Sequence, residues 1–271
     1  MSQNRNPSDS EKLNPEIAHS ARVWNYWLGG KDHYPSDREV GDHVSSLHPN
    51  IAHVARADRA FLGRVVHYLA ADIGIRQFLD IGTGLPTVDN THEIAQRVSP
   101  DSRVVYVDND PLVLVHARAL LTSTPEGATD YIEADLHDPK AILTAAEATL
   151  DFDKPVGIML LGILNFILDD GEAAAVVRQL LDRVPSGSYV AVTHPTFEIG
   201  GEANIEGMRF WNENATPKIR ARGSAEIARF FDGLELLEPG VVSCAHWRPD
   251  LPDIADQPPA VPQYGAVGLK P

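Results

Sequence analysis

The sequence predicts an α/β domain with a doubly wound, mostly parallel sheet, preceded by an N-terminal helical cover. Three observations lead to this fold class. Short apolar segments alternate with helical patterns, a Gly-x-Gly turn follows the first of these segments, and an acidic residue follows each of the first three. Such alternation is typical of parallel strands with helices on both faces. The length of 271 residues suits one domain of this kind.

The N-terminal quarter of the chain differs from the rest. Residues 1–14 are polar, and we expect a disordered tail there. Residues 15–75 are expected to form the helical cover. One helix should end at Leu28, where Gly29 or Gly30 supplies a left-handed stop. A second helix should follow Pro49, because apolar residues recur there at helical spacing.

Residues 76–271 contain the strand candidates and are expected to form the ligand-binding domain. The first five are short, apolar and rich in β-branched residues, as strands buried on both faces should be. They are Gln77–Ile81, Arg103–Val107, Asp130–Ala134, Val156–Leu161 and Tyr189–Thr193. Helical patterns lie between them, including Leu112–Leu121 and a stripe over 174–184.

The C-terminal third is less regular. Ser224 is expected to begin a short helix with Ile227, Phe230 and Phe231 on one face. Two more strands are predicted, Leu234–Val242 and Tyr264–Leu269, which brings the sheet to seven. A loop rich in Pro and Asp joins them.

Charge and composition restrict the possible partners. The chain has 23 Lys and Arg against 38 Asp and Glu, a net charge of −15, so nucleic acid is a disfavoured substrate. A small molecule or another protein fits better, and a homodimer stays possible.

No apolar run is long enough to span a membrane and the N-terminus lacks a signal-peptide core, so we expect a cytoplasmic protein.

A metal site is not expected. The chain has one cysteine, Cys244, which excludes a thiolate cluster. His43, His48 and His53 are spaced by five, a spacing that does not place them on one helix face. We expect most of the eleven histidines to lie on the surface.

The first chemical motif is FLDIGTGLP at Phe78–Pro86, directly after a predicted strand. Gly82 and Gly84, on either side of Thr83, allow a tight turn and a close approach to a ligand. Asp80 lies at the carboxyl edge of the sheet, where its carboxylate suits a cationic group. Thr87 stands where a dinucleotide fingerprint needs its third glycine, which argues against NAD. A tight turn without a ligand is the simpler alternative.

Two further acids end the next two strands. Asp108 follows the second strand, one strand–helix–strand step after Asp80, and an acid there can accept both ribose hydroxyls. Asp135 follows the third and can accept a hydrogen bond from a purine amino group. Asp110 and Asp138 precede prolines and are better explained as helix N-caps. Capping is also the structural alternative for Asp108.

Together these motifs resemble class I methyltransferases that bind S-adenosylmethionine. With YWLGGKD at Tyr26–Asp32, the chain is more closely similar to a prokaryotic family of such enzymes long catalogued as a domain of unknown function. The resemblance implies a seven-stranded sheet with Tyr264–Leu269 antiparallel at or near an edge, on the side of Val156–Leu161. It implies these cofactor-binding residues: Arg22, Tyr26, Gly30, Lys31, Asp80, Gly82, Thr83, Gly84, Asp108, Asn109, Asp135, Leu136 and Gly162.

Two departures from the wider pattern are present. Pro86 replaces a third glycine found in many class I enzymes, although the narrower family has proline there. Asn165, after the fourth strand, stands where this family is expected to have histidine. Because this position faces the reaction crevice, the change from histidine to asparagine affects the expected substrate or activity.

The sequence is less informative about the chemical step. Methyl transfer from a sulfonium is an in-line displacement that needs a general base only if the acceptor loses a proton. The candidates at the carboxyl edge are Asn165, His194 after the fifth strand and Tyr26 in the cover. We expect a small-molecule acceptor. A nicotinamide-dependent oxidoreductase and a catalytically silent cofactor-binding protein are the alternatives.

The cover is predicted to act as a lid over the cofactor. Its aromatic residues are costly to leave in water, and Gly29-Gly30 supplies backbone freedom near the pocket. Arg22 or Lys31 is expected to meet the carboxylate of the methionine moiety. A helix that merely covers a sheet edge is the alternative.

Overall fold

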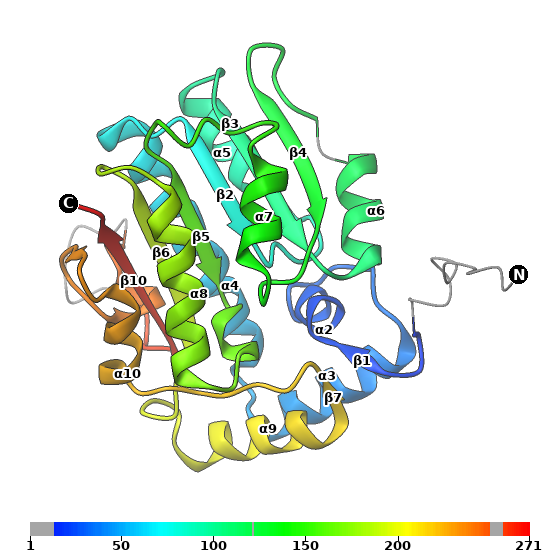
Figure 1. Cartoon of the computed structure of the whole chain (residues 1–271). Coiled ribbons are helices and arrows are strands. Elements are labelled where there is room, and N and C mark those ends of the chain that lie inside the picture. The colour runs from blue at the N-terminus through cyan, green and yellow to red at the C-terminus, as the bar shows by residue number, and fades with distance from the viewer. Residues whose placement is uncertain (1–13, 121, 250–256) are drawn as a thin grey trace, which may run out of the picture.

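The computed structural model describes residues 14–120, 122–249 and 257–271, and it contains one mixed sheet with helices on both faces (Figure 1). The predicted tail, apart from its last residue, and part of the loop before the last strand lie outside the described residues. No helix in the described part of the chain combines the length and the apolar character needed to cross a membrane.

The sheet confirms the predicted fold class, doubly wound and mostly parallel, but it has eight strands among the described residues rather than the predicted seven. Its strands run in the order β4-β3-β2-β5-β6-β10-β8, and the first five of these are parallel. Their bounds are β2 Gln77–Ile81, β3 Arg103–Asp108, β4 Ala128–Glu133, β5 Gly157–Leu161 and β6 Tyr189–Pro195. The last strand, β10 (Gln263–Leu269), is antiparallel to β6, so it lies one strand away from β5.

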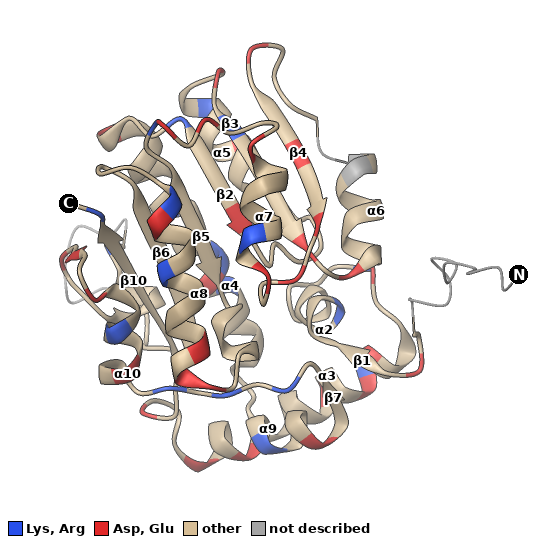
Figure 2. Cartoon of the chain, viewed as in Figure 1, with Lys and Arg blue, Asp and Glu red and all other residues tan. Residues whose placement is uncertain are grey.

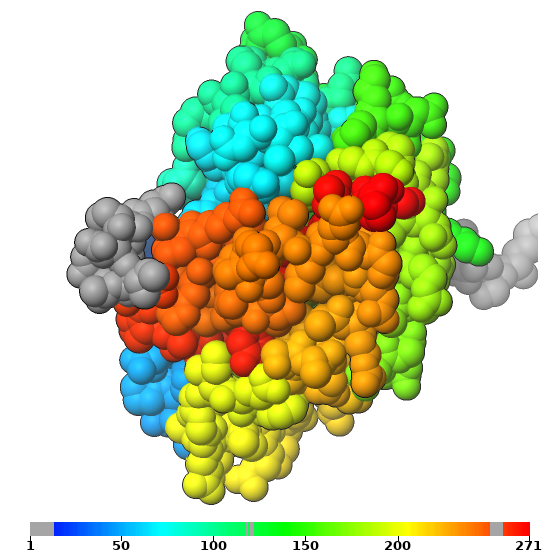
Figure 3. Space-filling view, turned by 90° about the vertical axis from the view of Figure 1, so that its left-hand side faces the viewer, coloured from blue at the N-terminus to red at the C-terminus, as the bar shows by residue number. Residues whose placement is uncertain are grey.

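The predicted strand Leu234–Val242 is wrong in its extent. In its place the structure has two short strands, β8 (Glu235–Leu236) and β9 (Val242–Ser243), which pair with β10 at separate positions. Gly240 between them has a φ of 85°, a left-handed conformation that turns the chain and interrupts the extended segment. Figure 3 faces the side of the molecule where β10 lies and shows the C-terminal segments, in orange and red, across the middle of that face.

Two apolar layers bury the two faces of the sheet. Alternate residues of β5 point to opposite layers: Ile158 and Leu160 to one, Met159 to the other. The first layer includes α7 (Pro139–Ala146), α8 (Asp170–Arg183) and α10 (Ser224–Ala228). The second includes α4 (Ile51–Tyr68) and α5 (Thr91–Val98). The helix α6 (Pro111–Leu120) packs beside β3 and β4.

A third, smaller apolar cluster holds the cover together. It joins α2 (Ser20–Trp27) and α3 (Pro35–Leu47) to α9 (Gly201–Asn214), a helix inserted after β6. Two short strands clasp the same segments, because β1 (Ala18–His19) pairs in parallel with β7 (Ala215–Thr216). Figure 1 places α2, α3 and α9 below the carboxyl ends of the parallel strands.

Local signals explain where the cover helices begin and end. Leu28 caps α2, and Gly29 follows with a φ of 83°, as predicted. Pro35 occupies the first turn of α3, while the Asp37 carboxylate accepts a hydrogen bond from the Tyr34 N–H at 2.7 Å. Since α4 packs against the sheet, we propose that the cover comprises β1, α2 and α3, with α9, rather than all of residues 15–75.

Candidate functional site

A cavity of about 330 Å³ separates the carboxyl ends of the parallel strands from the cover. Nine of the thirteen predicted cofactor residues line it, together with Asn165. They are Asp80, Gly82, Thr83, Gly84, Asp108, Asn109, Asp135, Leu136 and Gly162. The structure therefore brings the residues after β2, β3, β4 and β5 together at one edge of the sheet, as a doubly wound topology requires.

The turn after β2 depends on its glycines. Gly82 and Gly84 have φ values of 77° and 65°. A Cβ atom at Gly82 would lie 2.5 Å from Cδ1 of Ile163, a distance that side chains do not tolerate. The backbone N–H of Gly84 donates to Oδ2 of Asp108 at 2.9 Å, so the turn after β2 is fixed to the end of β3.

Asp80 is a buried carboxyl group at the floor of the cavity. Thr91 Oγ1 donates to its Oδ2 at 2.6 Å. Burial raises the pKa of Asp80 to about 6, although the Thr91 hydrogen bond acts in the opposite direction. A cationic ligand group beside it would favour the ionised form.

Asp108 is buried between two loops. Besides Gly84, it accepts a hydrogen bond from the Asp110 N–H at 2.9 Å, and burial raises its pKa. Each carboxylate oxygen keeps a second acceptor position, which is what contact with a diol needs. Asp110 itself accepts from the Leu112 N–H at 2.8 Å and thus begins α6 as predicted.

Asp135 is the most exposed of the three acids. Burial tends to raise its pKa, but hydrogen bonds from His137 outweigh that effect and the pKa is lowered. The backbone N–H of His137 donates at 2.9 Å, and its Nδ1 lies 2.6 Å from Oδ1. The Nδ2 atom of Asn109 lies 3.5 Å from the other oxygen, so the loops after β3 and β4 are in contact.

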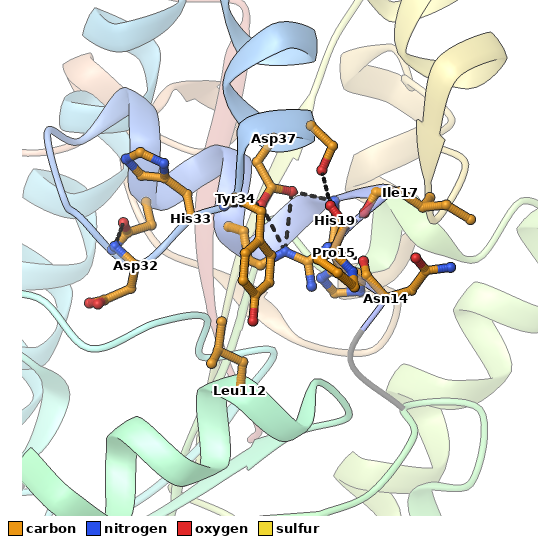
Figure 4. A network of polar contacts seen from close by, with 12 residues as sticks. Asn14, Pro15, Ile17, His19, Asp32, His33, Tyr34, Asp37 and Leu112 are labelled. Carbon is orange, nitrogen blue, oxygen red and sulfur yellow. Dashed lines mark hydrogen bonds and ion pairs between the residues drawn. The ribbon is translucent and has the colours of Figure 1, made fainter. Parts of the chain in front are cut away.

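Arg22 does not line the cavity, which corrects the expectation that it meets the cofactor carboxylate. Its side chain is 4% exposed, and its Nε lies 2.9 Å from Oδ2 of Asp37. Its Nη2 donates to the carbonyl oxygen of Ile17 at 2.7 Å. Figure 4 shows Asp37 at the centre of this network, which also takes the backbone N–H groups of His19 and Tyr34. Arg22 therefore stabilises the cover.

Tyr26, Gly30 and Lys31 also lie outside the cavity lining. The Tyr26 hydroxyl donates to Asp42 on α3, and this hydrogen bond is the main cause of its raised pKa. Gly30 packs directly over the side chain of Asn25, and Lys31 is exposed. Their predicted contacts with the cofactor, and a catalytic role for Tyr26, are not supported by this arrangement.

His194 is not placed to act as a base. It is fully buried and absent from the cavity lining. Its Nδ1 lies 2.9 Å from the carbonyl oxygen of Pro195, and Arg222 Nη1 lies 2.9 Å from its Nε2. These partners fix a neutral ring that donates from Nδ1 and accepts at Nε2. Burial lowers the pKa of His194 to about 3. The ring therefore has a structural role and joins β6 to Arg222.

Asn165 does face the cavity, as predicted. It lies in a 3-10 turn, Leu164–Phe166, and its backbone oxygen accepts from the Arg220 N–H at 2.9 Å. Within the described part of the chain its buried Oδ1 has no hydrogen-bond partner. Such a group costs free energy unless a ligand or water satisfies it.

Several lining residues were missed by the sequence prediction. Asp58 lies on α4 four residues before Leu62, so a carboxyl group interrupts the apolar face of that helix. A carboxyl group on an otherwise apolar helix face was the feature of the sequence that could have indicated this lining residue. Arg59, the next residue, also lines the cavity. His48 is 7% exposed and lines it too, so a surface location is wrong for this histidine.

The cover is tied to the site by charge. Arg22 Nη1 lies 3.9 Å from Oδ2 of Asp110, and His19 Nδ1 lies 3.0 Å from the same oxygen. These contacts join the start of α2 to the loop that carries Asp108. The cover therefore sits over the predicted ribose site.

Comparisons with known proteins indicate the family of the chain. The family model described as S-adenosyl methyltransferase matches residues 6–271. A DUF574 family protein from Streptomyces avermitilis is 48% identical, with a TM-score of 0.90, over 95% of this chain and 99% of that one. A candidate methyltransferase from Thermobifida fusca is 40% identical, with a TM-score of 0.87, over 96% and 97%. Among curated proteins, none matches.

Proposed function

The chain belongs to the S-adenosyl methyltransferase family, whose cofactor is S-adenosylmethionine, and on that premise we propose that it methylates a small-molecule acceptor inside the cavity. One observation carries the proposal. The Gly-x-Gly turn and the three acids that end β2, β3 and β4 line one cavity between the sheet and the cover. Residues expected to bind each part of the cofactor thus lie side by side.

The proposed pose follows the order of the strands. The adenine lies by Asp135 and Leu136, the ribose hydroxyls bond to Asp108 beside Asn109, and the methionine moiety lies over the glycine turn. The methionine ammonium then lies close to Asp80, whose ionised form it favours. Gly162 and Asn165, at the end of β5, lie near the methyl group.

Arg59 replaces Arg22 and Lys31 as the proposed partner of the methionine carboxylate. Among the described lining residues it is the one Arg or Lys side chain. Its Nη2 donates to the carbonyl oxygens of Val88 and Asp89, at 3.3 and 3.0 Å, in the segment after the glycine turn. A guanidinium held there lies near Asp80, and its charge offsets part of the rise that burial causes in the pKa of Asp80. A carboxylate is its natural ligand.

The enclosing walls suit methyl transfer. A sulfonium is strongly electrophilic, so alignment of the acceptor and exclusion of water supply most of the catalysis. The cover closes the cavity on the side opposite the sheet, so it keeps the reacting atoms out of bulk solvent.

The charge of the chain bears on the kind of acceptor. Figure 2 shows Lys and Arg spread over the ribbon among acidic residues, with a short basic run along the coil that leads to α10. The net charge of −15 favours a small acceptor over nucleic acid. We propose that the protein acts in the cytoplasm.

Calorimetric titration of the full chain tests the proposal. S-adenosylmethionine and S-adenosylhomocysteine should bind with one-to-one stoichiometry, and NAD should not. Tight NAD binding without S-adenosylmethionine binding would refute the proposed cofactor site. A chain that binds S-adenosylmethionine but yields no S-adenosylhomocysteine with any acceptor would instead be a silent binding protein.

A further inference from the structure

The part of the cavity lined by the cover is mostly apolar, and the proposed pose of the cofactor leaves it free. The amides of Asn25 and Asn204, which also line it, are hydrogen-bonded to the backbone. We define the acceptor chamber by Trp24, Trp27, His48, Ile51, Met208 and Trp211, all of which line the cavity. These residues come from α2, α3, α9 and the start of α4, across from the strand ends. The nearby charged residues belong to the sheet side, since Asp58 bonds to Gln263 of β10 and Arg59 to the loop at 88–89.

The indole rings of the chamber are held in place. Trp27 Nε1 donates to the carbonyl oxygen of Gly41 at 3.2 Å, and Trp211 Nε1 to that of Pro217 at 2.9 Å. The ring centroids lie 5.8 Å apart for Trp24 and Trp27, and 6.4 Å apart for Trp27 and Trp211. With their N–H groups occupied, Trp27 and Trp211 offer apolar surface only. Such walls suit a flat, uncharged molecule and give no counter-charge to an anion.

His48 is the titratable residue of the chamber. It ends α3 and packs against α9, where a Cβ atom at Gly207 would lie 3.9 Å from the Cβ of His48. Its side chain is nine-tenths buried, and within the described residues its Nδ1 has no hydrogen-bond partner. Burial lowers its pKa, so the ring is neutral at pH 7 and one of its two nitrogens carries a lone pair.

Building on the proposed function, we infer that the acceptor chamber binds an uncharged aromatic molecule with a hydroxyl group, and that His48 accepts the hydroxyl proton. The acceptor oxygen forms a bond to the methyl carbon as the sulfur–methyl bond breaks. The electron pair of that bond stays on sulfur, which becomes the neutral thioether of S-adenosylhomocysteine. The hydroxyl proton passes to the imidazole of His48 and then to solvent. His48 thus supplies the general base that was predicted at Tyr26 or His194.

Three matched probes test the substrate class on the full chain saturated with S-adenosylhomocysteine. The first is 4-ethylphenol. In 4-ethyltoluene a methyl group replaces its hydroxyl, and in 4-hydroxyphenylacetate a carboxylate replaces the terminal methyl of its ethyl group. Dissociation constants come from ligand-observed NMR titration. We expect 4-ethylphenol to bind about fivefold tighter than 4-ethyltoluene, the usual size of one hydrogen bond, and at least tenfold tighter than 4-hydroxyphenylacetate. Equal affinities, or no binding of 4-ethylphenol, overturn the inference.

A variant pair tests His48. His48→Phe should abolish the preference for 4-ethylphenol over 4-ethyltoluene and leave S-adenosylhomocysteine affinity within twofold. His43→Phe is the matched control, because His43 is exposed on the same helix and stacks on Phe210. In single turnover with S-adenosylmethionine, His48→Phe should slow methylation of bound 4-ethylphenol at least 100-fold. Binding without methylation by the unaltered chain, or methylation that His48→Phe does not slow, overturns the role of His48.

Two outcomes separate this inference from the proposed function. A chain that binds no S-adenosylhomocysteine refutes the proposed function itself. A chain that binds S-adenosylhomocysteine but shows no preference among the probes overturns the chamber assignment alone. The comparison of probes on the unaltered chain needs no variant, so it stays decisive even if His48→Phe fails to fold.

Discussion

The carboxyl edge of the sheet and the helical cover face each other across one cavity but are held in place differently. At the sheet edge, Asp80 and Asp108 are positioned by strands whose residues are buried in two large apolar layers. The cover has a small apolar cluster and relies on the buried ion pairs of Arg22, with Asp37 at 2.9 Å and with Asp110 at 3.9 Å. A single substitution should therefore damage the cover more than the sheet edge, whereas cofactor affinity should depend on the sheet edge.

The largest expected effect breaks the buried pair of the cover. Asp37→Ala removes the nearer carboxylate partner of Arg22 and the acceptor of two backbone N–H groups, those of His19 and Tyr34. Leaving the buried guanidinium with Asp110 alone, 3.9 Å away, should cost about 3 kcal/mol of unfolding free energy. Chemical denaturation of the full chain measures this. Asp42→Ala, at an exposed position on the same helix, should cost below about 1 kcal/mol. Equal losses would contradict this account of the cover.

The next effect concerns the sheet edge. Asp108→Ala should weaken S-adenosylhomocysteine binding by about 1.5–3 kcal/mol, the scale of lost charge-assisted hydrogen bonds. Calorimetry gives the affinity and circular dichroism checks the fold. Asp138→Ala is the control, since Asp138 caps α7 outside the cavity lining. If Asp108→Ala unfolds the chain while the folded fraction binds normally, Asp108 is a structural cap.

A pH titration sharpens the role of Asp80. Its pKa is about 6 in the unliganded protein, and the ammonium of a bound cofactor should lower it. Binding is then strongest above pH 6 and weakens as the pH falls through 6, by about tenfold between pH 7.5 and pH 5. In Asp80→Asn this dependence should flatten, because an amide does not titrate. A dependence that persists unchanged in Asp80→Asn would assign it to another group.

The smallest effect tests the structural reading of His194. Its pKa is about 3 when folded, so below pH 6.5 the unfolded chain binds a proton that the folded chain does not. Stability should therefore be complete above pH 6.5 and fall progressively toward pH 3. At pH 6 the loss from this group is about 0.8 kcal/mol relative to high pH. The free energy of unfolding, measured with denaturant, should differ less between pH 8 and pH 6 in His194→Gln than in the unaltered chain. An unchanged difference would refute the burial of a neutral ring.

The sequence was sufficient for the sheet edge because backbone geometry decides it. An acid that ends a parallel strand reaches the carboxyl edge whatever the side chains around it, so Asp80, Asp108 and Asp135 were predictable from position alone. Gly82 and Gly84 were predictable because few other residues adopt their φ values.

The cover was harder to predict because tertiary packing decides which of its charges face inward. Arg22 suggested an anion site, yet its partner is Asp37, fifteen residues away on the next helix. His48 and Trp211 reach the cavity only because α9, inserted after β6, packs against α3. No local pattern encodes that contact. Asp58 is intermediate, since its place on an apolar helix face was visible in the sequence.

A crystal structure of the full chain with S-adenosylhomocysteine tests the central claim most directly. The account predicts the ribose hydroxyls within hydrogen-bond distance of Asp108, the adenine by Leu136 and the methionine carboxylate at Arg59. The sulfur should point toward Asn165 and leave the acceptor chamber free. A cofactor whose adenine fills that chamber, or whose carboxylate reaches Arg22 through an opened cover, would contradict it.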